Sequence, residues 1–309
     1  MGDFAHWRSV GRWVLSEHVE DLVGGQAIIE GVMVRQGRRW AAAARRDDGS
    51  IAVTDGDIAA RDRWWWRVPV LRGALAAAES LRVGLAATRW SQSLSREPDQ
   101  TSVRERAAAV SVGLAVVTIF LLVPTSVAHA VVDHGWSTSL LEGGLLLALF
   151  VSYLWLLGRF PSIRRTFGYH GAEHMCVGAW EHDGLVSIDA ARDHSARHPR
   201  CGTDLLLMIV AVSIVLFRFL PGGIDPWALF ARLLMVPIVA GIAYELLRLG
   251  GTSRWPMVRR VLSAPGLAAQ RLTTAAPDDQ QLEVAVAAMH HLVGTTVSAS
   301  RLERSPAPR

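Results

Sequence analysis

The chain has 309 residues, half of them hydrophobic, and its 32 basic and 28 acidic residues give a formal net charge of +4. No lysine occurs, so every basic residue is an arginine. From Arg106 onward the apolar residues come in long runs with few charges, which argues against two soluble domains. Nucleic acid is not expected as a partner, because the excess of basic residues is explained by arginines on the cytoplasmic side of a membrane.

Residues 1–104 are predicted to form a cytoplasmic region ahead of the membrane domain. Met1–Glu20 has the spacing of a short amphipathic helix with Trp7 and Trp13 at apolar positions, and no cleavable signal peptide is recognised. Residues 24–53 contain the β-rich runs AIIEGVMV and IAV, separated by QGRR and DDGS, the second a strong turn signal. This pattern predicts a small antiparallel β-meander.

Three tryptophans, Trp64–Trp66, precede a helix predicted over residues 68–90. Leucines and alanines recur at helical spacing along one face, and arginines with a glutamate line the other face. Such a helix with aromatic anchors is typical of a membrane interface, and a helix packed on the meander would show the same pattern. The polar residues 91–104 predict a linker.

Four apolar runs approach or exceed the length of about 20 residues that a helix needs to cross a bilayer. A soluble four-helix core is disfavoured, because soluble helices of this length normally carry a polar stripe. The third run is short and contains Arg218. Residues 105–250 are therefore expected to form a four-span membrane domain. The runs are Ala107–Val132, Leu140–Leu157, Leu205–Leu220 and Trp227–Leu249.

The distribution of arginine predicts the orientation of these spans. The connections 133–139 and 221–225 contain no arginine, whereas the segment 159–204 is rich in it. By the positive-inside rule, both termini and segment 159–204 face the cytoplasm. Cys176 and Cys201 lie in that segment, where a reducing compartment disfavours a disulfide. The expected fold is a mainly α-helical integral membrane protein with about four transmembrane helices plus a small cytoplasmic β-meander.

Residues 251–309 are predicted to form a cytoplasmic helical tail. The pair Pro265–Gly266 indicates a turn, and a helix is expected to start near Pro277–Asp278. The apolar stripe of this helix consists of Leu282, Ala285, Met289 and Leu292.

Segment 159–204 holds two pairs of histidines with the spacing H-x-x-x-H. A helix places residues i and i+4 on one face, so each pair can present two imidazoles to one metal ion. Pro199 would end the second helix. The pattern favours a divalent metal, zinc first; the alternatives are hydrogen-bonded structural histidines and histidines that contact an anionic headgroup. The candidate ligands are His170, His174, His194, His198 and Cys201.

Glu173 lies between the histidines of the first pair and gives the order H-x-x-E-H. In inverzincin proteases, which share this order, both histidines bind zinc and the glutamate activates water. Glu173 is therefore the candidate catalytic residue, although it could instead orient a ligand histidine or form a salt bridge. Further candidates for supporting the site or contacting a substrate are Gln26, Glu30, Arg72, Glu79, Arg200 and Glu245.

Several long motifs resemble the YqhQ-like family of bacterial membrane proteins. They are GGQAIIEGVMVR, RRDDGSIAV, LRGALAAAES, YHGAEH, HSARHPRCGT, VAGIAYELLR and PGLAAQRLTTAAPDDQQLEVAVAA, and they extend from Gly24 to about Ala288. The family has a domain of unknown function and is described as predicted metal-dependent enzymes. The resemblance implies an integral protein of the bacterial cytoplasmic membrane with a metal site on the histidine-rich segment. Cys176 departs from the family pattern and is a poor ligand candidate.

Two functions of different classes are compatible with these residues. The first is a zinc hydrolase at the cytoplasmic membrane interface, acting on an unknown peptide or lipid-linked ester. The second is a non-catalytic multi-pass protein in which a metal or hydrogen bonds hold the histidine-rich segment and the soluble part recruits a partner. A transporter fits less well, because the spans hold few central polar groups, although a homo-oligomer would be able to build a pathway. Catalytic zinc keeps an open coordination position, and structural zinc does not.

Overall fold

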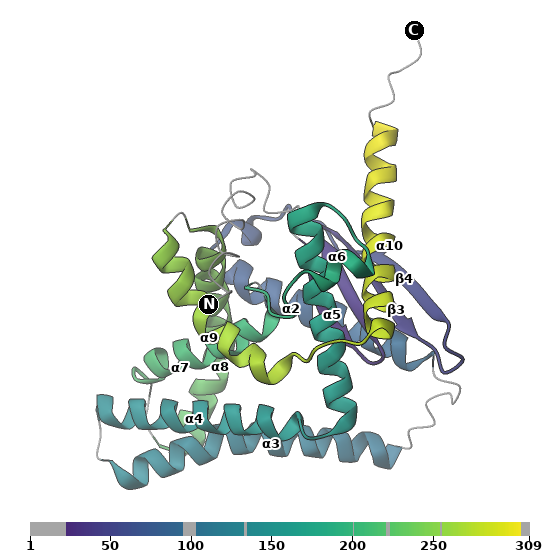
Figure 1. The fold of residues 1–309 in the computed structure, drawn as a ribbon. Helices are drawn as coiled ribbons and strands as arrows, with labels where there is room; N and C mark the ends of the chain where they lie inside the picture. Colours follow the sequence, from purple (N-terminus) through teal and green to yellow (C-terminus); the bar gives the residue numbers. More distant parts are fainter. Residues whose placement is uncertain are drawn as a thin grey trace.

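The computed structural model describes residues 23–94, 103–132, 135–199, 201–220, 223–253 and 255–303. The helix expected over Met1–Glu20 lies outside these residues, as do Arg200 and most of the predicted linker. Two parts of the protein are visible in Figure 1: a sheet covered by helices, and a group of long apolar helices beside it.

Four antiparallel strands form one sheet in the order β1-β2-β3-β4, which confirms the predicted meander. The predicted run AIIEGVMV is not a single strand, because the chain turns at Ile29–Glu30, where Glu30 has a φ angle of 50°. The turn folds β2 back along β1 and places Gln26 opposite Met33. The strands are β1 (Val23–Ile28), β2 (Gly31–Gln36), β3 (Arg39–Arg45) and β4 (Ile51–Asp57).

Helices cover both faces of this sheet. α5 (Pro161–Asp183) and α10 (Asp279–Glu303) pack on one face, in a core that includes Val34. α2 (Leu71–Gln92) packs on the opposite face, in a second core that includes Met33. Adjacent residues of a strand point to opposite faces, so β2 serves both cores.

The alanines of β3 let these helices approach closely. Ala41–Ala44 are at most 1% exposed, and each packs against a helix or a neighbouring strand.

The helix α10 confirms the predicted tail helix. Its expected stripe of Leu282, Ala285, Met289 and Leu292 is at most 2% exposed.

α2 buries mainly small residues and exposes three of its leucines, Leu71, Leu81 and Leu85. It follows a 3-10 turn, η3 (Trp64–Arg67), and a Cβ at Gly73 would lie 2.6 Å from the carbonyl oxygen of Gly241. Leu81 and Leu85, which belong to the predicted apolar stripe, are 63% and 46% exposed. The helix therefore packs through small side chains against the helix that contains Gly241, and through Val83 and Ala87 against the sheet, while Leu81 and Leu85 face outward.

Among the residues that the structure describes, three helices are long and apolar enough to cross a membrane, over Val110–Val131, Trp136–Leu157 and Pro226–Gly250. They belong to α3 (Val103–Val131), α4 (Trp136–Leu157) and α8 (Pro226–Thr252). The remaining expected span, Leu205–Leu220, corresponds to a shorter apolar helix of 16 residues, α7 (Gly202–Phe217). The described part of the chain is thus mainly helical, with three possible spans and an N-terminal four-stranded antiparallel sheet.

α9 (Pro256–Thr273) corrects one expectation of the sequence. The predicted turn at Pro265–Gly266 is wrong, because both residues lie inside this helix. Gly266 is needed there for a different reason: any Cβ at this position would collide with the side chain of Asp204 at the start of α7. The glycine therefore allows α9 and α7 to pack closely, beside the histidine-rich segment.

Candidate metal centre

α5 carries the first histidine pair between the apolar helices and the sheet. Pro161 occupies the first turn of the helix, and Gly184, with a φ angle of 67°, ends it in the left-handed conformation. Within the helix, His170 and His174 lie one turn apart, with ring centroids separated by 4.4 Å. The predicted helix and its shared face are therefore both present.

Backbone carbonyls determine which nitrogen of each imidazole carries the proton. The Nδ1–H of His170 donates to the carbonyl of Thr273 at 2.9 Å, and that of His174 donates to the carbonyl of Ala196 at 2.8 Å. A carbonyl only accepts hydrogen bonds, so both Nε2 atoms keep their lone pairs. Metal-binding histidines typically have their second nitrogen held in this way.

Cys201 completes a group of three potential ligands. Its Sγ lies 3.0 Å from Nε2 of His170, so the thiol donates to that nitrogen. Ligand atoms of His170, His174 and Cys201 all lie within 4.8 Å of one another, and Cys201 is 7% exposed. Two imidazole nitrogens and a sulfur so arranged could hold a metal ion. No second group of this kind occurs among the described residues.

Glu173 lies at the edge of this group. Its side chain is 3% exposed, and Oε2 lies 3.5 Å from Nε2 of His174 without a hydrogen-bond partner. Burial raises the pKa of this carboxyl to about 7, and the nearby His198 partly opposes the shift. The other carboxylate oxygen packs against Gly25 of β1, where a Cβ would approach Oε1 to 2.8 Å. The glycine motif of β1 therefore forms part of the wall around Glu173.

Burial keeps the histidines neutral. It lowers the pKa of His170, although the hydrogen bond to Thr273 opposes the shift. The pKa of His174 is well below the ordinary value because of burial, with further lowering by His170 and His198. Burial also lowers the pKa of His198, against the raising effect of Glu173 and Asp204. Neutral imidazole is the form that binds a metal.

The second histidine pair is not on a helix, which corrects the expectation for it. The nearby helix α6 (Ile188–Arg192) ends before His194, and the residues that follow are irregular. The two side chains therefore go to different places. The His198 ring centroid is 5.9 Å from that of His174, and its Nε2–H donates to Glu181 at 3.2 Å. His194 is not brought to the group of three; it contacts Asp183 at 2.7 Å.

Three polar residues that hold the site together carried no recognisable signal in the sequence. Gln270 of α9 is fully buried; its Oε1 accepts from the backbone N–H of His198 at 2.8 Å. Its Nε2 donates to the carbonyl of His198 at 2.8 Å and to Oδ1 of Asp204 at 3.0 Å. With Thr273, these residues lie about 70 to 100 positions from their partners, so no local spacing indicates the contact.

The remaining candidates form contacts outside the group of three. Glu30 pairs with Arg165 at 2.6 Å and accepts from the Tyr169 hydroxyl at 3.2 Å. Arg72 donates two hydrogen bonds to Glu245, at 2.7 and 2.6 Å, so these two candidates pair with each other. In two further contacts, Glu79 pairs with Arg61 and Gln26 packs against Gly84.

Fold and site together define a mainly helical protein with possible membrane spans and a buried group of two histidines and a cysteine that could hold a metal. The chain belongs to the family described as protein of unknown function (DUF1385), whose model matches residues 68–295. It is 30% identical over 303 residues to the uncharacterized protein YqhQ of Bacillus subtilis (strain 168), covering 90% of this chain and 95% of that protein. No solved structure matches.

Proposed function

We propose that the protein is a metal-dependent hydrolase, with zinc as the preferred ion, that acts at the cytoplasmic face of a bacterial membrane. The observation that carries the proposal is the convergence of one ring nitrogen each of His170 and His174 with Sγ of Cys201 within 4.8 Å. Two imidazoles and a thiolate are a donor set that zinc favours. Three protein ligands also leave one of four tetrahedral positions open, as catalytic zinc sites do.

Glu173 is suited to the role of general base because of its position. It is not a member of the group of three, yet its Oε2 is within 3.5 Å of a ligand nitrogen and has no hydrogen-bond partner. When bound in such a site, zinc lowers the pKa of water toward about 7. Glu173 would then take a proton from the attacking water and return it to the leaving group. His170 and His174, fixed through their Nδ1 atoms, would keep the geometry.

The proposed membrane location rests on the helices around the site. α5 begins four residues after the last residue of α4, a possible span, and carries two of the proposed ligands. The exposed leucines of α2 would contact the interface with the bilayer. The arginine-rich segment that contains the site would face the cytoplasm. A peptide or a lipid-linked ester near the bilayer surface is the proposed kind of substrate.

A closed structural site is the second candidate, and burial favours it. His174 is 2% exposed and Glu173 is 3% exposed, so water has little access to either side chain. In that case Glu173 would be a fourth ligand or would orient His174. The site would then join α5 to the segment that precedes α7, and the sheet would be free to recruit a partner.

Substitution of Glu173 separates the two functions. Glu173→Gln keeps the size and shape of the side chain and removes the base, so the catalytic proposal expects zinc near one per chain and a loss of about 10²–10⁴ in hydrolysis. Glu181→Gln is the matched control, because Glu181 lies on the same helix but contacts His198. This variant should keep both the bound zinc and the hydrolytic activity. Purified proteins would be compared by metal analysis and with fluorogenic peptides and esters, and in cells by complementation of a deletion.

Complementation by Glu173→Gln as complete as that by the wild type would exclude Glu173 as the base. A fall of zinc affinity by about 10–100-fold, without a separate effect on turnover, would instead support the structural site.

A further inference from the structure

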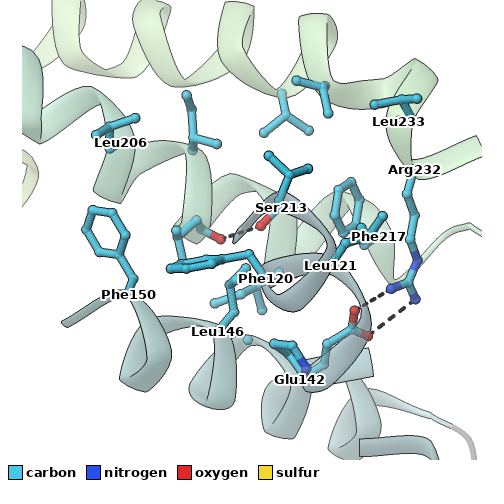
Figure 2. A pocket seen from close by; sticks show the side chains of 18 of the residues that line it. Phe120, Leu121, Glu142, Leu146, Phe150, Leu206, Ser213, Phe217, Arg232 and Leu233 are labelled. Carbon is cyan, nitrogen blue, oxygen red and sulfur yellow. Dashed lines mark hydrogen bonds and ion pairs between the residues drawn. The ribbon is translucent and has the colours of Figure 1, made fainter. Parts of the chain in front are cut away.

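A cavity of about 420 Å³ lies among α3, α4, α7 and α8 (Figure 2). Its walls are almost entirely aliphatic and aromatic side chains. Several of them are also exposed at the outer surface of the helices, including Leu233 at 62%, Leu206 at 49% and Val236 at 47%. The cavity therefore opens sideways, onto the surface that a membrane would cover.

The cavity is elongated along the helices. On α4 its lining runs from Ser139 to Tyr153, which corresponds to about 21 Å at 1.5 Å per residue. One leaflet of a bilayer contributes about half of the ~30 Å hydrocarbon core. The cavity is thus somewhat longer than the share of one leaflet and suits an extended hydrocarbon chain, whereas a compact polar metabolite would leave most of the lining uncovered.

One end of the cavity is polar. Glu142 of α4 accepts from Arg232 of α8 at 2.5 Å, and Figure 2 shows this pair at the end opposite Phe150 and Leu206. Arg232 is 2% exposed and lines the cavity, yet its Nε has no hydrogen-bond partner. A buried N–H donor without a partner is costly, so the group is suited to receive an acceptor from a ligand.

The positive charge of Arg232 and the negative charge of Glu142 cancel at this end of the cavity, so a neutral ligand group is favoured over an anion. Glu142 neutralises Arg232, and Thr125 of α3 accepts from the same guanidinium at 2.5 Å. A free anion would repel Glu142, whereas a neutral carbonyl oxygen would accept from Nε–H without that cost. Arg232 lies about 9 Å along α8 from Pro226. The span Pro226–Gly250 is longer than the hydrocarbon core is thick, so Pro226 lies outside the hydrocarbon core. Arg232 therefore lies near the hydrocarbon boundary, where lipid ester groups are found.

We propose that this cavity binds one glycerophospholipid of the membrane, with an acyl chain along the apolar walls and an ester carbonyl accepting a hydrogen bond from Nε of Arg232. The site is distinct from the group of His170, His174 and Cys201, and the proposal stands whether or not that group is catalytic. Ionisable residues inside membranes are expensive to bury, so a buried pair such as Arg232 and Glu142 indicates a functional site by default.

The first test fills the cavity. Protein purified in mild detergent would be exposed to a phospholipid that carries a photoreactive diazirine in one acyl chain, and cross-linked peptides would be mapped. Leu146→Trp places a large ring in the cavity and should lower the cross-linking yield about tenfold. Leu147→Trp is the matched control, since Leu147 is the next residue, is 41% exposed and does not line the cavity, and should leave the yield unchanged.

The second test addresses the carbonyl. Arg232→Lys keeps a charge opposite Glu142 but removes the Nε–H. Wild type should retain a diester phospholipid about fivefold better than the diether analogue, the equivalent of one hydrogen bond, and the variant should lose this preference. Equal retention of the two lipids by the wild type would overturn the assignment. So would equal cross-linking of both tryptophan variants, selective retention of a polyprenyl lipid, or occupation of the cavity by a second copy of the chain.

Discussion

Replacement of Gly25 by alanine tests the contact between β1 and Glu173. A Cβ at this position would lie 2.6 Å from the carbonyl oxygen of Met33 and 2.8 Å from Oε1 of Glu173. Neither distance is sustainable, and one of the two neighbours is backbone in the paired strand, so the Glu173 carboxylate must move. Gly24, the preceding residue, has no atom within 4 Å of its corresponding Cβ position and provides a matched control.

The expected changes in the free energy of unfolding have opposite signs at Gly25 and Gly24. Insertion of a methyl group into a filled space costs about 1–3 kcal/mol. Replacement of glycine by alanine in an open strand position without a positive φ stabilises by about 0.4–1 kcal/mol, because the unfolded chain loses freedom. Gly25→Ala should therefore be destabilised by about 1–3 kcal/mol, whereas Gly24→Ala should be neutral or slightly more stable. For a chain of this size, each kcal/mol corresponds to a shift of about 2–4 °C in Tm.

Thermal unfolding in detergent, followed by tryptophan fluorescence, measures the difference directly. Zinc content of the same samples reports on the site, because displacement of Glu173 disturbs the surroundings of His174. Equal melting temperatures for Gly25→Ala and Gly24→Ala would show that Gly25 is not packed against Glu173. A lower Tm with unchanged zinc content would keep the packing argument and show that Glu173 does not contribute to metal affinity.

Three further predictions concern thiols, the Gln270 contacts and topology. Burial, with a smaller effect of Glu173, raises the pKa of Cys176 to about 12. Iodoacetamide at pH 8 should therefore leave this thiol unmodified in folded Cys201→Ser protein, and rapid labelling would contradict the burial of Cys176. In Cys176→Ser protein, labelling of Cys201 should require a chelator. Gln270→Leu leaves the backbone of His198 and the carboxylate of Asp204 without partners and should lower stability by about 1–3 kcal/mol, whereas exposed Arg271→Leu should change it by less than about 0.5 kcal/mol. Reporter fusions after Gly135 and after Ser187 should report opposite sides of the membrane, and equal readouts would exclude the proposed orientation.

The parts of the fold that the sequence predicted are those with local periodicity. The spacing of His170 and His174 indicated one helical face, and α5 has it. Long apolar runs indicated α3, α4 and α8, because bilayer-spanning composition is a property of a single segment. A turn was likewise indicated at DDGS, and this segment lies between β3 and β4. In each of these cases the interaction that decides the structure joins residues close together in the chain.

Tertiary contacts decided the elements that were missed. Ala41–Ala44 would favour a helix by intrinsic propensity, but the run lies between β2 and β4 and is covered by helices, so small side chains suit a strand there. Pro265 lies within α9, where the sequence indicated a turn.

The candidate site was predictable only in part, for the same reason. The first histidine pair needed only one helix. The second pair was expected on a helix as well, but His198 is held by Gln270 from α9, and His194 turns toward Asp183. The carbonyls of Thr273 and Ala196, which orient the imidazoles, carry no side-chain signature in the sequence. Exclusion of His194 from the group therefore required the folded chain.

X-ray absorption at the zinc edge of the purified protein tests the central claim most directly. The account predicts about one zinc per chain, with one sulfur ligand at about 2.3 Å and the remaining nitrogen or oxygen ligands at about 2.0–2.1 Å. The sulfur signal should disappear in Cys201→Ser and persist in Cys176→Ser. Absence of metal from protein purified without chelators, or a zinc shell without sulfur, would contradict the proposal that His170, His174 and Cys201 bind one ion.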